Sequence, residues 1–145
     1  MSTIILLSTG QYTIGMKYIH VANQDLCQRL LALSGWRDTE HYWYQNWLRQ
    51  DRWEVGSIGY QDESTLPAYD LGYLLDNLPP NTQIMYTHKE GKRDYAVASA
   101  YRFDPSRCYC ELLADAKADT PVNALCWLAI ALFQQGIIKK EDIDD

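Results

Sequence analysis

Aromatic rings and arginines are concentrated in one short stretch of this chain. Four of its five tryptophans fall between Trp36 and Trp53, and Tyr42, Tyr44 and Tyr60 lie among or beside them. Such rings bury large areas, stack on flat ligands and, together with arginine, dominate the energetics of protein interfaces. The stretch is therefore compatible with three uses: a hydrophobic core, a surface that docks a partner, or a pocket that holds a ring-shaped ligand.

The spacing within the stretch predicts a helix over 40–50, with Thr39 as its N-cap. Trp43 and Trp47 are four residues apart, so they share one face of that helix and are expected in the core. Tyr42 departs from this face and is the ring that we most expect to be exposed. The rings and arginines outside the core face form the candidate partner-binding surface: Trp36, Arg37, Tyr42, Arg49, Arg52, Trp53 and Tyr60.

The other reactive side chains carry no catalytic or metal-binding motif. The sequence has no G-x-S-x-G elbow, and Ser8–Gly10 matches neither of the common glycine patterns that bind phosphate. Cys108 and Cys110 would share a strand face, but zinc sites usually space their ligands as C-x₂₋₄-C. We therefore expect no catalytic residue, no metal and no cofactor. A cysteine nucleophile paired with His41 or His88 stays open as an alternative.

Charge and composition narrow the partners. The formal net charge of −6 and the lack of a basic stripe disfavour nucleic acid, whose binding needs lysines and arginines to neutralise phosphates. The apolar runs are too short for a signal peptide or a membrane span. A chain of 145 residues needs no disulfide, so reduced cysteines are expected. These properties predict a cytoplasmic protein in which residues 1–138 form a single globular domain and 139–145 a charged, flexible tail.

The first half, residues 1–65, is expected to alternate strands with helices. Asn23 and Gly35 bracket a helical apolar pattern, as an N-cap and a C-terminal glycine do. The expected elements are a strand over Thr3–Ser8, a second strand over Lys17–Val21 that could form a hairpin with it, a helix over 24–34, the helix over 40–50 and a short strand over Arg52–Ile58.

The second half, residues 66–138, has the clearest pattern. Thr120 and Pro121 are typical of a helix start, and Gly136 ends that helix. The expected elements before it are a helix over Ala68–Leu78 and strands over Thr82–His88, Asp94–Phe103 and Arg107–Ala114. Short turns join these strands into an antiparallel three-stranded meander. The prediction is an α+β fold, with an α-β-β-β-α half and the aromatic-rich half packed against it.

Two resemblances follow from this order of elements. The α-β-β-β-α order resembles double-stranded RNA-binding domains, but 118–123, at the start of the last helix, has no Lys or Arg to hold phosphates. The Leu-rich helix in Leu66–Pro79, the Tyr-rich meander and the sequence TPVNALCWLAIALFQQGII of Thr120–Ile138 are similar to small uncharacterised bacteriophage and prophage proteins. That resemblance covers about half the chain. It implies a phage or mobile-element origin and brings no catalytic residues.

These observations favour a non-enzymatic protein that binds another protein, from the host or a second copy of itself, as a phage accessory or host-interaction factor. The first alternative is an enzyme or a small-ligand or nucleotide-binding protein, with a pocket between the two halves lined by His41 and nearby rings. The second alternative is a self-assembling structural protein.

Overall fold

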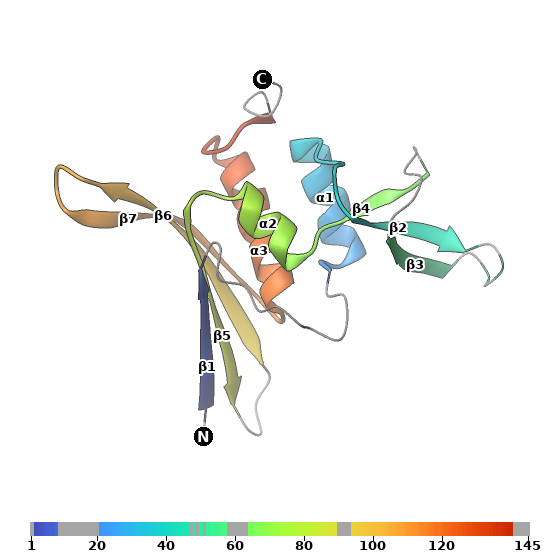
Figure 1. Cartoon of the computed structure of the whole chain (residues 1–145), viewed down its shortest axis with the longest axis horizontal. Coiled ribbons are helices and arrows are strands. Elements are labelled where there is room, and N and C mark those ends of the chain that lie inside the picture. Colours follow the sequence, from blue (N-terminus) through green and yellow to red (C-terminus); the bar gives the residue numbers. More distant parts are fainter. Residues whose placement is uncertain are drawn as a thin grey trace.

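The fold consists of a layer of helices between two antiparallel sheets (Figure 1). The computed structural model describes residues 2–8, 21–46, 48, 50, 52–57, 64–89 and 94–140. In this part of the chain the helices are α1 (Gln24–Ser34), α2 (Leu71–Asn77) and α3 (Pro121–Gln134). The strands are β1 (Ser2–Ser8), β2 (His41–Asn46), β3 (Arg52–Ser57), β4 (Leu66–Ala68), β5 (Asn81–Lys89), β6 (Tyr95–Asp104) and β7 (Tyr109–Ala118). The predicted α+β class is confirmed.

The larger sheet has the strand order β1-β5-β6-β7, and each neighbouring pair is antiparallel. It contains the predicted meander as β5, β6 and β7. The turn between β6 and β7 forms as expected, because the carboxylate of Asp104 accepts hydrogen bonds from the backbone N–H and the hydroxyl of Ser106. Strand β7 ends at Ala118 rather than at Ala114, and a register irregularity lies between Ala100 and Tyr101 of β6.

The first strand pairs with a neighbour that the sequence did not predict. Strand β1 pairs with β5, placing Leu6 opposite Met85, so it extends the meander from the far end of the sequence. Most of the predicted strand over 17–21 lies outside the described residues; its last residue, Val21, forms an isolated bridge to Asp70. An edge strand of a sheet offers unpaired backbone groups to any strand that can reach it, so local turn signals did not decide this partner.

The prediction of a helix over 40–50 is wrong. Residues His41–Asn46 form β2, which pairs with β3 on one side and with β4 on the other, in the order β3-β2-β4. Trp43 and Tyr44 are neighbours in this strand and therefore point to its opposite faces. Trp43 still packs against the core, as expected, and Trp47 lies outside the described residues.

Local capping signals placed α1 and the start of α3 as predicted. Helix α1 spans the predicted residues, with the Asn23 side chain accepting from the Leu26 N–H at 2.9 Å and Gly35 in the left-handed conformation at φ 71°. Helix α3 begins with the Thr120 cap and Pro121, as expected. Helix α2 starts at Leu71, three residues later than predicted, because Asp70 caps it and the preceding Leu66–Ala68 belongs to β4.

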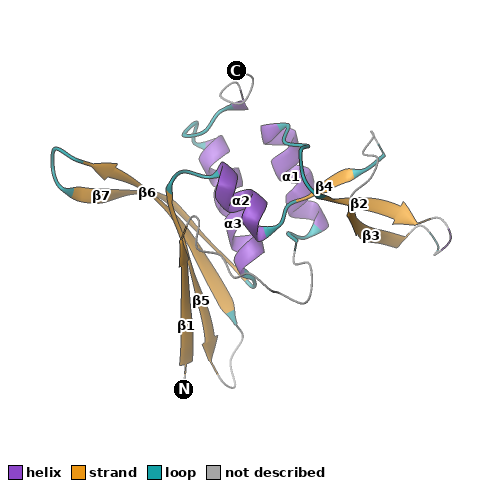
Figure 2. Ribbon diagram, viewed as in Figure 1, coloured by secondary structure: helices purple, strands orange, loops and turns teal. Residues whose placement is uncertain are grey.

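The core lies between the helix layer and the inner face of the larger sheet (Figure 2). Small side chains on β6, namely Ala96, Ala98 and Ala100, are fully buried and allow α3 to pack closely on the sheet. Leu125, Leu128 and Leu132 of α3 are fully buried in the same core. No helix in the described part of the chain is long and apolar enough to cross a bilayer.

Candidate functional site

The structure distributes the predicted partner-binding residues over several environments. Trp36 belongs to the core: it is only 5% exposed, and its ring meets Phe133 and Tyr73 edge-on, with centroids 5.2 and 6.1 Å away. Arg37 is exposed, and its guanidinium donates to the carbonyl oxygen of Thr65 at 3.5 Å. Trp36 therefore contributes to packing, and Arg37 contacts the segment that precedes β4.

Tyr42, Arg52 and Trp53 lie on the β2–β3 hairpin. Its antiparallel register puts Tyr42 and Arg52 on one face and Trp53 on the other. Tyr42 and Trp53 are half-buried and Arg52 is exposed, so Tyr42, the ring most expected to be exposed, is exposed only in part. Arg49 and Tyr60 of the predicted surface lie outside the described residues, so the structure brings together only part of that set.

A tyrosine pair covers one face of this hairpin. The rings of Tyr42 and Tyr44 are 6.0 Å apart between centroids, and the Tyr44 hydroxyl donates to the Glu54 carboxylate at 3.2 Å. Gly56, opposite Tyr42, leaves the space that both rings use: a Cβ there would lie 3.2 Å from the Tyr44 ring and 3.3 Å from the Tyr42 ring. The pair is thus packed onto the hairpin itself.

The most exposed apolar cluster among the described residues lies instead on the β6–β7 hairpin, which projects beyond the helix layer (Figure 1). Because alternate residues of β6 are buried against the helices, Tyr101 and Phe103 point to the outer side of the sheet. Their cross-strand partners are Leu112 and Cys110, on the same side. We call these four residues the hairpin patch. Phe103 is 52% and Leu112 50% exposed, which is unusual for side chains of this size.

Charged pairs occupy the opposite side of the same hairpin. Arg102 donates to the Glu111 carboxylate at 2.9 Å, and this contact raises the pKa of Arg102. Oδ2 of Asp104 lies 3.7 Å from Nε of Arg107, and hydrogen bonds from Ser106 lower the pKa of the Asp104 carboxyl group. The hairpin therefore has one apolar face and one face whose charges pair with each other.

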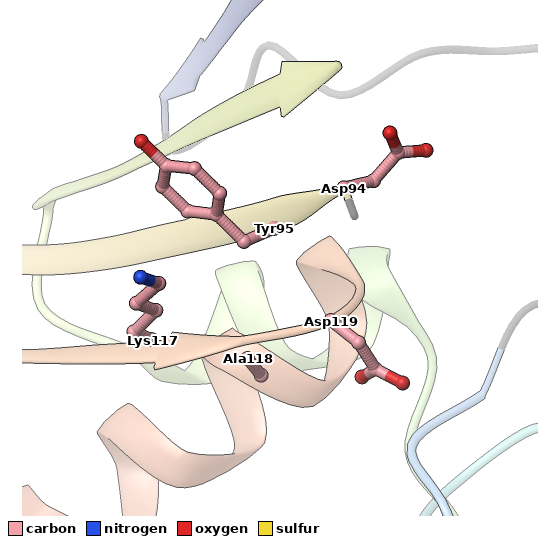
Figure 3. Close-up of a pocket in the computed structure, with 5 residues that line it drawn as sticks. All are labelled: Asp94, Tyr95, Lys117, Ala118 and Asp119. Carbon is pink, nitrogen blue, oxygen red and sulfur yellow. The ribbon is translucent and has the colours of Figure 1, made fainter. Parts of the chain in front are cut away.

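A shallow hollow of about 340 Å³ lies where β6 begins and β7 ends (Figure 3). Lys117 places its ammonium 4.3 Å from the centre of the Tyr95 ring, and the Asp119 carboxylate accepts from the amide of Asn123 at 3.0 Å. Asp94 accepts from the Tyr86 hydroxyl at 2.7 Å, which raises the Tyr86 pKa. The polar groups of this hollow are thus engaged within the protein, and neither His41 nor the N-terminal rings line it.

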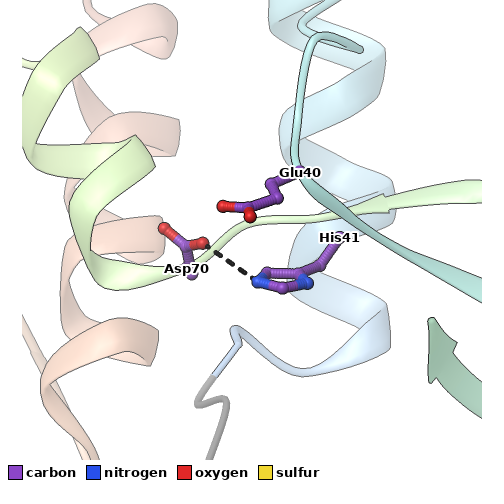
Figure 4. A group of neighbouring side chains, drawn as sticks. All are labelled: Glu40, His41 and Asp70. Carbon is purple, nitrogen blue, oxygen red and sulfur yellow. Dashed lines mark ion pairs between the residues drawn. The ribbon is translucent and has the colours of Figure 1, made fainter. Parts of the chain in front are cut away.

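A second polar cluster brings together Glu40, His41 and Asp70 (Figure 4). One potential metal-binding atom from each residue lies within 4.8 Å of the other two. Sequence reasoning missed this cluster, because it considered His41 only as a partner of a cysteine nucleophile or as the lining of a pocket and assigned no role to Glu40 or Asp70. Only the adjacency of Glu40 and His41 is visible in the sequence, because Asp70 approaches them through the pairing of β2 with β4.

Comparison with protein-family models, with curated proteins and with solved structures found no match to this chain.

Proposed function

We propose that this chain is a non-catalytic protein-binding module and that the hairpin patch is its docking surface. The observation that supports this most strongly is the exposure of Phe103 and Leu112, which lie diagonally across the two strands on one face of a projecting hairpin. Apolar side chains grouped in this way mark interaction sites, because isolated exposed residues are common but contiguous exposed patches are not.

The backbone beside the patch favours an extended partner segment. Strand β7 is the last strand of its sheet, so one row of its N–H and C=O groups has no neighbouring strand in the described structure. A partner segment that adds to this edge would gain main-chain hydrogen bonds, while alternate apolar side chains would reach Leu112 and Cys110. Main-chain pairing would give affinity and the patch would give specificity.

The net charge of the chain favours one kind of partner at this surface over another. The chain carries a net charge of −6, so two copies repel each other, whereas a neutral or basic protein approaches without that penalty. The charges behind the patch are already paired within the hairpin. We therefore propose a different protein with an apolar extended segment and no net negative charge. The phage-like resemblance of residues 66–138 makes a bacterial host protein in the cytoplasm the concrete proposal.

Paired binding measurements test this function. Three tagged proteins are used to capture partners from a lysate of the organism that encodes the chain: wild type, F103S/L112S and the control L48S/I137S. The control removes two exposed apolar side chains elsewhere on the surface. Each captured protein is then purified and its Kd measured directly. We expect the Kd to rise at least about tenfold for F103S/L112S, as is usual for interface anchors, and to stay unchanged for L48S/I137S.

Three outcomes contradict the proposal. The first is a purified partner that binds wild type and F103S/L112S equally. The second is a lysate from which no protein binds the wild-type chain specifically. The third is a wild-type dimer, seen by light scattering, that F103S/L112S converts to monomer, because the patch would then serve self-association. Equal melting temperatures of the variants and wild type establish that the comparison is between folded proteins.

A further inference from the structure

The cluster of Glu40, His41 and Asp70 is built by the smaller sheet and the helix that follows it. His41 is the first residue of β2 and pairs with Ala68 of β4, two residues before Asp70. Asp70 caps α2: one carboxylate oxygen, Oδ1, accepts from the Tyr73 N–H at 2.8 Å. This bond orients the second oxygen, Oδ2, which lies 3.7 Å from Nε2 of His41. Two positions of the cluster are therefore fixed by backbone pairing and by a helix cap.

The His41 imidazole has no hydrogen bond to any described residue, although the residue is only 9% exposed. The 3.7 Å separation from Asp70 is too long for a hydrogen bond, and Nδ1 is buried without a partner. Nε2 of this imidazole has no hydrogen bond to a described residue and can accept a further ligand, whereas such a ligand would leave the buried Nδ1 unsatisfied. Its Nε2 points toward Asp70, with the Glu40 carboxylate close by (Figure 4). Two acceptor-only groups and an imidazole nitrogen thus converge on one small volume.

We propose that Glu40, His41 and Asp70 bind a divalent first-row transition-metal ion, with Zn²⁺ as the best-matched ion. One imidazole nitrogen and two carboxylate oxygens form a ligand set that zinc accepts, whereas Mg²⁺ and Ca²⁺ prefer oxygen ligands alone. The two carboxylates balance the charge of the ion. Three protein ligands leave a coordination position for water or another molecule, as in zinc sites that are not purely structural.

The environment of each ligand fits this role. Glu40 is exposed and gives the ion a path from solvent, whereas His41 is held in the interior. The Asp70 carboxylate is oriented by its bond from Tyr73, as ligating carboxylates usually are. Nδ1 of His41 lacks the second hydrogen bond that commonly strengthens a histidine ligand, so we expect an affinity below that of structural zinc sites. This proposal is independent of protein binding by the hairpin patch.

Metal titration of the full chain tests the site. Cys108 and Cys110 are exposed thiols that can bind zinc, so the experiment uses the C108S/C110S background. Calorimetric titration of chelator-treated protein with Zn²⁺ should show one equivalent bound. E40Q and D70N should each weaken binding at least about tenfold, and the double variant should abolish it. Asn at position 70 still caps α2, so D70N removes the ligand while keeping the cap. D115N, which alters an exposed carboxylate outside the cluster, should bind like its parent.

A spectroscopic measurement identifies the ligands. Co²⁺ in place of Zn²⁺ should produce visible absorption bands without the thiolate charge-transfer band, and the imidazole NMR signals of His41 should shift on metal addition. Absence of saturable Zn²⁺ binding in the C108S/C110S background would overturn the proposal. So would an unchanged affinity in E40Q/D70N, because binding would then take place elsewhere. The melting temperatures of the metal-free variants confirm that a lost affinity does not reflect unfolding.

Discussion

The phenol hydroxyl of Tyr69 donates a hydrogen bond to the backbone carbonyl oxygen of Trp36 at 2.7 Å, although 33 residues separate them. Tyr69 follows β4 and is fully buried, and Trp36 follows the C-terminal Gly35 of α1. The Tyr69 ring also stacks on the Tyr73 ring, with the two ring centroids 5.5 Å apart, and the Tyr73 ring meets the Trp36 ring edge-on. This relationship joins the end of α1 to the start of α2, so part of the aromatic stretch serves to connect the helix layer with the smaller sheet.

Replacement of Tyr69 by Phe tests that junction. The variant keeps the ring but leaves the Trp36 carbonyl oxygen without the hydroxyl that donates to it. We expect the free energy of unfolding, measured by urea denaturation, to fall by about 1–3 kcal/mol. Y109F is the matched control, because within the described residues the Tyr109 hydroxyl accepts one hydrogen bond, from the exposed Arg107 side chain at 3.3 Å. Its loss should change stability by less than about 0.5 kcal/mol. Equal stability of Y69F and wild type would contradict the structural role of this hydrogen bond.

The alanines of β6 should tolerate no enlargement. Ala98 is fully buried under α3, between Ile84 of β5 and Ala116 of β7. Ala98→Leu would force α3 away from the sheet, and we expect a loss of about 1–3 kcal/mol in unfolding free energy. The neighbouring Val97→Leu faces the outer side and should have little effect. Comparable losses in both variants, measured by urea denaturation, would contradict the assignment of inner and outer faces.

Stability should decrease at alkaline pH. Burial raises the pKa of Tyr69 and Tyr73 above the ordinary value of 10.0, and hydrogen bonding to Asp38 raises that of Tyr73 further. Burial also raises the pKa of the Cys27 and Cys126 thiols above 9.0. In each case the unfolded chain releases its proton at a lower pH than the folded protein does.

The stabilising effect of these neutral groups is therefore complete below about pH 9, and it is lost as pH rises from there towards the folded-state pKa values. Urea denaturation between pH 7 and pH 11 should give a free energy of unfolding that is flat at first and then falls. An increase above pH 10 would contradict the sign of these shifts. Because Y69F lacks one of the ionising groups, its decline should be less steep than that of wild type.

The four cysteines should divide into two reactive and two protected thiols. Cys108 and Cys110 are exposed on the β6–β7 hairpin, whereas Cys27 and Cys126 are buried in the core, where burial raises their pKa. The thiolate is the reactive form, so burial and a raised pKa both slow the reaction. Titration with a thiol reagent should give two fast equivalents in native protein and four in denaturant. C108S/C110S should abolish the fast reaction, and fast modification of all four thiols would contradict the burial of Cys27 and Cys126.

Several elements could be predicted because their signals are local. Asn23 and Gly35 defined the ends of α1, and Thr120 and Pro121 defined the start of α3, since caps act within one helical turn. The turn at Asp104 joined two strands of alternating pattern and so predicted their pairing in the meander. The mixed α+β class followed from these elements.

The aromatic stretch could not be assigned in the same way. Over a segment as short as His41–Asn46, aromatic residues can match both a helical spacing and a strand alternation. The segment forms a strand because its backbone groups pair with β3 on one side and with β4 on the other. Contacts with Tyr73 of α2 and Phe133 of α3 bury Trp36, and the pairing of β2 with β4 brings Asp70 to His41.

The sequence by itself thus determined the net charge of −6 and the elements whose boundaries depend on neighbouring residues. Tertiary structure alone decided that β1 pairs with β5, that Tyr101, Phe103, Cys110 and Leu112 meet on one outer face, and that Glu40, His41 and Asp70 converge. The physical reason is that strand partners and register are set by contacts between distant segments, whose free energy no local pattern of residues records.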